Sequence, residues 1–260
     1  MKRLHIVGSP RSGTTLLMEL IVTCFKNNGH CEHEMNIFKI PEINHGLYIS
    51  KQPSDIKYIE KFLNFDEALF VLYIVRDPRS VISSIHKSHQ GKYFCNFRVW
   101  KECENSARKL NGHERFLKIK YEDLVQNEAN VQKKIINKFP FLEKIHNFSE
   151  YEKFAKTSKK SSNAMGGVRE ISSNRITGWR KNLPRIKSEY LKNPDMVDAL
   201  IENGYEKDDS WTKILDNITP VKYNCRYPDF EPLLKKLETK FRKWIKFKKY
   251  VWKRKKMRSD

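Results

Sequence analysis

Residues 4–15 read LHIVGSPRSGTT, and this stretch decides the fold. The apolar run 4–7 ends at Gly8, which is typical of a buried strand. A second glycine, Gly13, opens a segment that we expect to be helical as far as residue 28, with its apolar side chains on one face. A strand, a loop bounded by glycines and a helix, in that order, are the context that a phosphate-binding loop requires.

The loop offers an anion several kinds of partner. Glycines let the backbone wrap closely, and the first helical N–H groups and the helix dipole face the bound group. Arg11 adds a cation, and Thr14 and Thr15 add hydroxyl donors. The glycine spacing is that of the Walker loop, but Thr14 stands where that loop has its lysine. Because a nucleoside triphosphatase needs the lysine on its phosphates, the loop predicts a different phosphate ligand. An ordinary turn with incidental glycines is the alternative.

Alternating strand and helix signals follow the loop. The strongest strand signal is residues 69–75, which are apolar on both faces, as in the centre of a parallel sheet. The pattern predicts a three-layer α/β/α fold with a central parallel sheet, a P-loop-like phosphate-binding loop and a helical C-terminal part. We expect residues 1–230 to form one domain and residues 231–260 a basic amphipathic tail. Further elements are expected as follows: strands at 31–38 and 115–121, helices at 55–63, 97–110 and 130–139, and a mobile loop at 157–178.

A second anion site is predicted where the central strand ends. Arg76 is the first residue after this strand, and ligands of open α/β folds bind at that edge of the sheet. A helix starting at Pro78 would place Ser80 and Ser84 on one face, four residues apart. Arg76 and Ser84 are then expected to hold one phosphate together, with the arginine bidentate. The alternative is a structural salt bridge from Arg76 beside a capped helix with solvent-facing serines.

Together these motifs resemble those of sulfotransferases that use 3'-phosphoadenosine 5'-phosphosulfate (PAPS). The segment 10–15 resembles the family's 5'-phosphosulfate loop, and Arg76-Asp77-Pro78 followed by Ser84 resembles its 3'-phosphate motif. Two weaker similarities lie in 121–124 (YEDL) and around Gly178-Trp179-Arg180. The resemblance extends over roughly residues 4–205.

The resemblance implies a role for each matching residue. Arg76 and Ser84 would hold the 3'-phosphate, and Arg175 would close over the nucleotide. The family's chemistry needs no metal, so PAPS is the expected cosubstrate and no metal ion is expected. The residues implied to hold the 5'-phosphate and the leaving oxygen are Pro10, Arg11, Ser12, Gly13, Thr14 and Thr15.

Sulfuryl transfer needs a base for the acceptor hydroxyl and positive charge at the transferred group. Arg11 is the expected source of that charge. Members of the family that sulfate carbohydrate or tyrosine often carry a glutamate on or after the second strand, where this chain reads CEHEMNIF over 31–38. We favour Glu34 as the base, with His33 second and Glu32 third; strand alternation would place the two glutamates on one face and His33 on the other. His86 and His89 are further alternatives.

The net charge of +20 favours anionic partners. Residues 231–260 hold 13 Lys or Arg and three Asp or Glu, with apolar residues at helical intervals among them. Such a tail suits an anionic membrane surface, an acidic glycan, or a terminal helix packed on the domain. No motif for nucleic acid is visible, and no nucleic-acid partner is expected.

The expected function is therefore transfer of a sulfuryl group to a hydroxyl, with a saccharide as the acceptor. Two alternatives stay open: a kinase-like phosphotransferase, and a non-catalytic basic module for membrane or nucleic acid. No secretory signal is visible, and the longest apolar run, 68–75, is far below the ~20 residues of a membrane helix. We expect a cytoplasmic protein, peripheral at the membrane if the tail binds lipid.

Overall fold

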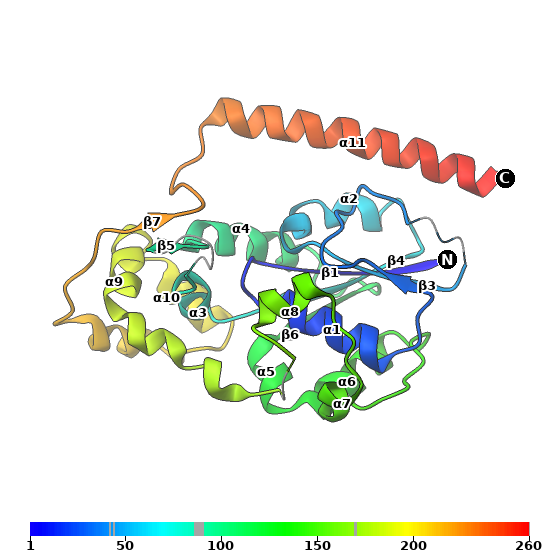
Figure 1. Cartoon of the computed structure of the whole chain (residues 1–260). Helices are drawn as coiled ribbons and strands as arrows, with labels where there is room; N and C mark the ends of the chain where they lie inside the picture. Colours follow the sequence, from blue (N-terminus) through cyan, green and yellow to red (C-terminus); the bar gives the residue numbers. More distant parts are fainter. Residues whose placement is uncertain (42, 44, 86–90, 169–170, 260) are drawn as a thin grey trace.

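The computed structural model of the chain describes residues 1–41, 43, 45–85, 91–168 and 171–259. A parallel sheet of five strands in the order β2-β3-β1-β4-β6 forms its centre (Figure 1). Helices cover both faces of this sheet, so the predicted three-layer α/β/α fold is confirmed. The strands of the sheet are β1 (Lys2–Gly8), β2 (Gly29–His30), β3 (Leu47–Lys51), β4 (Leu69–Val75) and β6 (Phe116–Lys120).

Two hydrophobic clusters, one on each face of the sheet, form the core. One cluster involves α1 (Thr14–Cys24), α5 (Tyr121–Gln126), α6 (Glu128–Lys138), η2 (Phe148–Glu150) and α7 (Tyr151–Phe154). The other involves η1 (Pro53–Lys57), α2 (Ile59–Leu63), α3 (Pro78–Ile82), α4 (Phe97–Arg108), η4 (Gly178–Asn182), α9 (Leu183–Lys192), α10 (Met196–Glu202), η5 (Asp209–Leu215) and α11 (Leu233–Ser259). The remaining elements are α8 (Lys159–Met165), η3 (Ser173–Arg175) and a small sheet of β5 (Lys92–Tyr93) and β7 (Asn224–Cys225).

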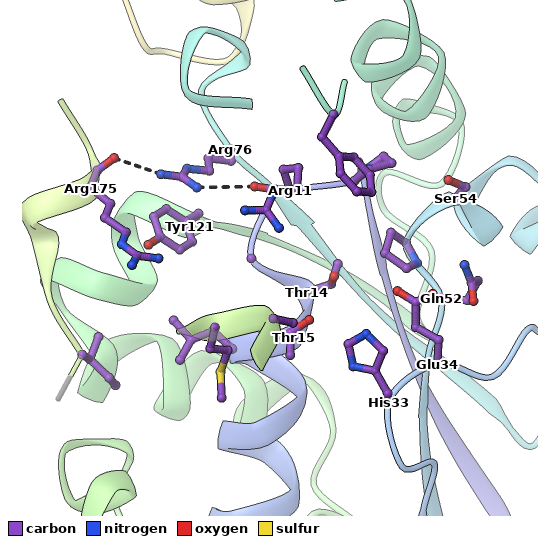
Figure 2. A pocket seen from close by; sticks show the side chains of 18 of the residues that line it. Arg11, Thr14, Thr15, His33, Glu34, Gln52, Ser54, Arg76, Tyr121 and Arg175 are labelled. Carbon is purple, nitrogen blue, oxygen red and sulfur yellow. Dashed lines mark hydrogen bonds between the residues drawn. The ribbon is translucent and has the colours of Figure 1, made fainter. Parts of the chain in front are cut away.

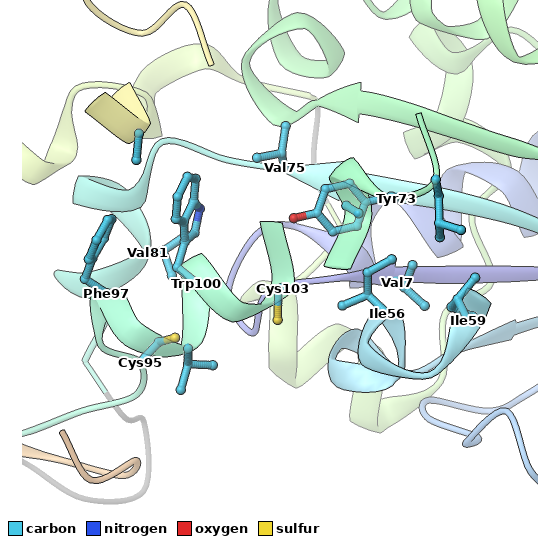
Figure 3. Packing of buried hydrophobic residues seen from close by; sticks show 14 of the residues in the cluster. Val7, Ile56, Ile59, Tyr73, Val75, Val81, Cys95, Phe97, Trp100 and Cys103 are labelled. Atoms are coloured by element: carbon cyan, nitrogen blue, oxygen red, sulfur yellow. The ribbon is translucent and has the colours of Figure 1, made fainter. Parts of the chain in front are cut away.

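Strand β1 shows why the sequence folds this way. Its residues from Arg3 to Gly8 are buried, since helices cover both faces of a parallel sheet. Leu4 and Ile6 join the cluster of α1, whereas Val7 joins the cluster that contains Trp100 (Figure 3). Because β1 pairs with β4 in parallel, the ends of these two strands meet at one edge of the sheet.

Several predicted elements differ in the structure. Residues 31–38 are not a strand: β2 ends at His30, and beyond it the backbone N–H groups of Cys31 and Met35 donate to carbonyls of β3 without forming a continuous ladder. The sheet position beside β1 belongs instead to β3, which the sequence analysis did not predict. The first helix ends at Cys24, where Phe25 is already extended. The predicted mobile loop at 157–178 contains the helix α8, capped by Ser158.

A buried polar network fixes the segment that leaves β2. The guanidinium of Arg3 donates to the backbone oxygens of residues 36, 37 and 39, and to Ser50 Oγ at 2.8 Å. His5 Nδ1 also lies 2.8 Å from Ser50 Oγ, and its Nε2 lies 3.4 Å from Asp55. Asp55 in turn accepts from the backbone N–H of Ile37 at 2.5 Å. Burial lowers the pKa of His5 to about 4, because no water solvates the imidazolium.

Replacing His5 by Gln should flatten the dependence of stability on pH. Below the ordinary pKa of 6.5 the unfolded chain binds a proton that folded His5 accepts only near pH 4. The free energy of unfolding therefore falls as the pH falls through this window, by up to about 3 kcal/mol. Urea unfolding at neutral pH and at about pH 4.5 measures the slope. The same substitution at exposed His45 is the matched control. An unchanged slope in His5→Gln would contradict the assignment.

Candidate active site

The loop between β1 and α1 is held in a conformation that most residues avoid. Gly13 has φ of 101°, and a Cβ there would lie 2.6 Å from the Tyr121 ring. Arg11, with φ of 73°, is the only non-glycine of the described residues in the left-handed region. Ser12 is buried and closes the loop from within, donating to the Ser9 carbonyl at 2.7 Å. Strain of this kind is found at ligand-binding loops, where the surrounding structure maintains it.

The loop faces a cavity of approximately 540 Å³, a size that suits a nucleotide with part of a second substrate. The N-terminus of α1 opens into it, so unpaired backbone N–H groups and the positive end of the helix dipole point inward. Of the predicted loop residues, those that line the cavity are Pro10, Arg11, Gly13, Thr14 and Thr15.

Arg11 connects the loop to the second predicted anion site. Its Nε donates to Ser84 Oγ at 2.7 Å, and its guanidinium lies 5.6 Å from the Phe94 ring centroid. Ser84 is not on the helix, because α3 ends at Ile82. The prediction that Ser80 and Ser84 share a helical face is therefore wrong: Ser80 Oγ donates to the carbonyl of Ile176 instead.

Arg76 lies beside Arg11 (Figure 2). Its Nη1 donates to the Arg11 carbonyl at 3.4 Å and its Nη2 to the Arg175 carbonyl at 2.9 Å. The guanidinium stacks over the Tyr121 ring, 4.2 Å from its centroid. Arg76 Nε is buried and has no acceptor among the described residues. Arg76 and Ser84 therefore lie in one cluster with Arg11 between them.

Three guanidinium groups surround this part of the cavity. Arg175, in η3, lines it together with Arg11 and Arg76. Burial lowers the pKa of Arg11, and the charges of Arg76 and Arg175 lower it further. Because like charges repel in a partly buried cavity, an anion between them is stabilised.

A buried arginine supports the turn that carries Arg76. Arg79 donates to Asp77, and its guanidinium lies 4.0 Å from the Trp179 ring centroid and 5.0 Å from that of Trp211. Glu206 accepts from its other terminal nitrogen at 2.5 Å. The segment around Trp179 thus packs on the turn of the second anion site rather than lining the cavity.

Glu34 lies at the opposite end of the cavity, beyond Thr15 (Figure 2). Lys51, at the end of β3, donates to Glu34 at 3.4 Å and to Thr15 Oγ1 at 3.0 Å. The Lys51 side chain is 1% exposed and that of Glu34 is 40% exposed. Burial lowers the pKa of Lys51, while the Glu34 carboxylate opposes this effect. A carboxylate and an ammonium group therefore stand together beside the start of α1.

The other two candidate bases are placed differently from the prediction. His33 lines the cavity with Glu34, and its Nδ1 lies 3.4 Å from Ser161 Oγ on α8. Burial, followed by the charge of Lys51, lowers the pKa of His33. Glu32 does not line the cavity: its carboxylate pairs with Lys160 at 3.1 Å. Strand alternation was the wrong basis for grouping the glutamates, because this segment is not a strand. His86 and His89 lie outside the described residues.

Lys51 is the residue that the sequence analysis missed. The run 47–51 mixes polar and apolar residues and is short, so no strand was predicted there. A lysine at the carboxyl end of a predicted strand next to β1 would have been the signal. Within the described residues, no group of three His, Cys, Asp or Glu is placed to hold a metal ion.

Several solved structures of known proteins are similar to this chain. No family model and no curated protein match the chain. The sulfotransferase domain of the Synechococcus PCC 7002 olefin synthase is 15% identical, with a TM-score of 0.48, over 69% of this chain and 87% of that one. The sulfotransferase domain of the curacin biosynthetic pathway is 14% identical, with a TM-score of 0.49, over 69% of this chain and 90% of that one. Mouse sulfotransferase SULT7A1, in complex with 3'-phosphoadenosine 5'-phosphate (PAP), is 15% identical, with a TM-score of 0.44, over 82% of this chain and 88% of that one.

Gly13→Ala should destabilise the protein more than Gly112→Ala. Both glycines have positive φ, but a Cβ at Gly112 meets nothing within 4 Å. Gly112→Ala is the control, and it should lower the free energy of unfolding by about 1 kcal/mol because of its backbone conformation alone. Contact with Tyr121 should add about 1–3 kcal/mol at Gly13. Chemical unfolding measures the free energy of unfolding of both variants. Equal decreases in the two variants would show that Tyr121 does not restrict the conformation of the loop.

Proposed function

We propose that this chain is a sulfotransferase that moves the sulfuryl group of PAPS to an acceptor hydroxyl. The observation that carries the proposal is the hydrogen bond from Arg11 to Ser84, which joins the phosphate loop to a second anion site. Arg76 of the second site and the phosphate loop line one cavity, which fits a nucleotide with phosphate groups on both its 3' and 5' carbons. Thr14 at the Walker lysine position is a second argument, because a triphosphate would need that lysine.

The proposed cosubstrate would lie along the cavity from Arg76 to Thr15. Arg76 and Ser84 would hold the 3'-phosphate, with Arg175 closing over it. The loop would hold the 5'-phosphosulfate through its backbone N–H groups, Arg11 and the threonine hydroxyls. Among the described residues Arg11 donates through Nε alone, so its two terminal nitrogens remain for the anion in the cavity that it lines.

In the proposed transfer the acceptor oxygen attacks sulfur, and the bond from sulfur to the 5'-phosphate oxygen breaks. The hydroxyl proton passes to Glu34, which we propose as the general base. Lys51 holds this carboxylate and also contacts Thr15, so its charge lies near both the base and the transferred group. Arg11 stabilises the negative charge that develops on the leaving phosphate. His33 remains the second candidate for the base.

A saccharide is the acceptor that we propose. The end of the cavity around Glu34 is lined by polar side chains that pair with hydroxyl groups, namely those of His33, Gln52 and Ser54. Hydroxyl-rich acceptors are recognised through such a set of donors and acceptors.

Calorimetric titration with 3'-phosphoadenosine 5'-phosphate (PAP), and in parallel with ATP, tests the proposed cosubstrate. PAP should bind with or without magnesium, and by about tenfold or more tighter than ATP. Its two phosphates would occupy both anion sites, whereas the triphosphate lacks its lysine. Binding of ATP alone, and only with magnesium, would overturn the sulfotransferase proposal in favour of a phosphotransferase.

Glu34→Gln should keep PAP affinity but lower sulfuryl transfer by about 10²–10⁴-fold, because the amide cannot take the proton. The measurement uses ³⁵S-labelled PAPS with a panel of saccharides and then with the acceptor that the wild type sulfates. Glu32→Gln is the matched control, because the Glu32 carboxylate lies two positions before Glu34 in the chain but pairs with Lys160 outside the cavity. Full activity in Glu34→Gln, with loss in His33→Gln, would move the base to His33.

A further inference from the structure

The C-terminal helix α11 rests on the domain along one face (Figure 1). Phe247 and Tyr250 pack edge-on against Phe62 of α2, with ring centroids 5.0 and 4.8 Å apart. Tyr250 is 2% exposed and donates to Asp66, which also pairs with Arg254 at 2.8 Å. These residues recur at three- and four-residue steps, so a single face of the helix is docked.

A different face of α11 carries large apolar side chains that the domain does not cover. Their positions follow helical steps, and this stripe is turned roughly 135° away from the docked face. The exposed fractions include 52% at Leu237, 63% at Phe241 and 66% at Trp252. We call the following residues the apolar stripe: Leu233, Leu234, Leu237, Phe241, Trp244, Ile245 and Trp252.

Basic residues border the apolar stripe and also interrupt it. Lys240 lies between the stripe and the docked face, whereas Lys248 and Lys255 lie at helical steps within the stripe itself. The opposite border is exposed and consists of Lys235, Arg242, Lys246, Lys249, Lys253 and Lys256. Long lysine and arginine side chains in such places keep their charge in the headgroup region while the apolar face enters the acyl boundary.

We propose that the apolar stripe of α11 docks on the surface of an anionic lipid bilayer. The surplus of ten positive charges in residues 231–260 complements anionic headgroups. Docking of a second copy of the chain would bring two such helices together, and their positive charges would repel each other. An acidic polysaccharide would match the charge but leaves the apolar side chains exposed to water. No described helix has the length and apolar character that a membrane span requires.

The tryptophans support this assignment and provide its probe. Trp100, Trp179 and Trp211 are buried, with exposures of 1%, 4% and 6%. Trp244 and Trp252 are 48% and 66% exposed, and both lie on the apolar stripe. Tryptophan prefers the membrane interface, where its ring is buried and its N–H remains solvated. Lipid binding by this face will therefore change the fluorescence of these two residues and leave the buried three unaffected.

The test uses the full chain with phosphatidylcholine vesicles, with and without about 25 mol% phosphatidylglycerol. The anionic vesicles should float the protein and shift its tryptophan emission to shorter wavelength, and about 0.5 M salt should weaken both effects. Leu237→Ser/Phe241→Ser keeps the charge and both probe tryptophans, and should weaken binding by about tenfold or more. Ile145→Ser/Leu191→Ser is the control: these residues are 50% and 57% exposed away from α11, and this variant should bind like the wild type.

Three results would overturn the proposal. Equal flotation of Leu237→Ser/Phe241→Ser and the wild type would show that the stripe does not enter the lipid. A vesicle-free emission shift that grows with protein concentration and disappears in that variant would assign the stripe to a second copy. Binding to heparin beads without any binding to anionic vesicles would assign the helix to an acidic polysaccharide. The proposal is independent of the sulfotransferase activity, because none of these readouts uses PAPS or an acceptor.

Discussion

The parallel pairing of β1 with β4 is the constraint on which the site depends. Gly8 at the end of β1 is in register with Ile74, two residues before Arg76. A Cβ at Gly8 would lie 2.6 Å from the Ile74 carbonyl, so the two strands can pair to their ends only because position 8 is glycine. The phosphate loop and the turn of Arg76 therefore leave the sheet side by side, close enough for Arg11 to reach Ser84.

The charges of the site divide along the cavity. Arg11, Arg76 and Arg175 gather at one end, and burial makes their mutual repulsion significant. Glu34 lies at the other end and is held by the buried ammonium group of Lys51. The arginine end of the cavity therefore favours an anion, and the end with Glu34 suits a group that loses a proton. The supporting contacts are internal: Arg79 fixes the turn at one end, and the network of Arg3, His5 and Asp55 fixes the segment after β2 at the other.

The sequence predicted the elements whose signal is local. Strand β4 is apolar along its whole length, and β1 has the apolar residues Leu4, Ile6 and Val7 directly before a loop with a recognisable pattern of glycines, so both strands were predicted together with the three-layer fold. The short strand β3 mixes Tyr48, Ser50 and Lys51 with two apolar residues, and only its place between β2 and β1 makes it a strand. Lys51 was missed for that reason. The contact of Arg11 with Ser84 spans 73 positions in the chain and has no local signal.

The central claim is that two separate anion sites bind one nucleotide, and a cycle of two proteins and two ligands tests it most directly. Calorimetry would compare PAP with adenosine 5'-phosphate, in the wild type and in Arg76→Ala. The account predicts that the wild type binds PAP about tenfold or more tighter, and that Arg76→Ala loses this preference while its affinity for adenosine 5'-phosphate stays within about twofold. Equal affinities of the wild type for the two ligands, or an equal loss for both in Arg76→Ala, would contradict it.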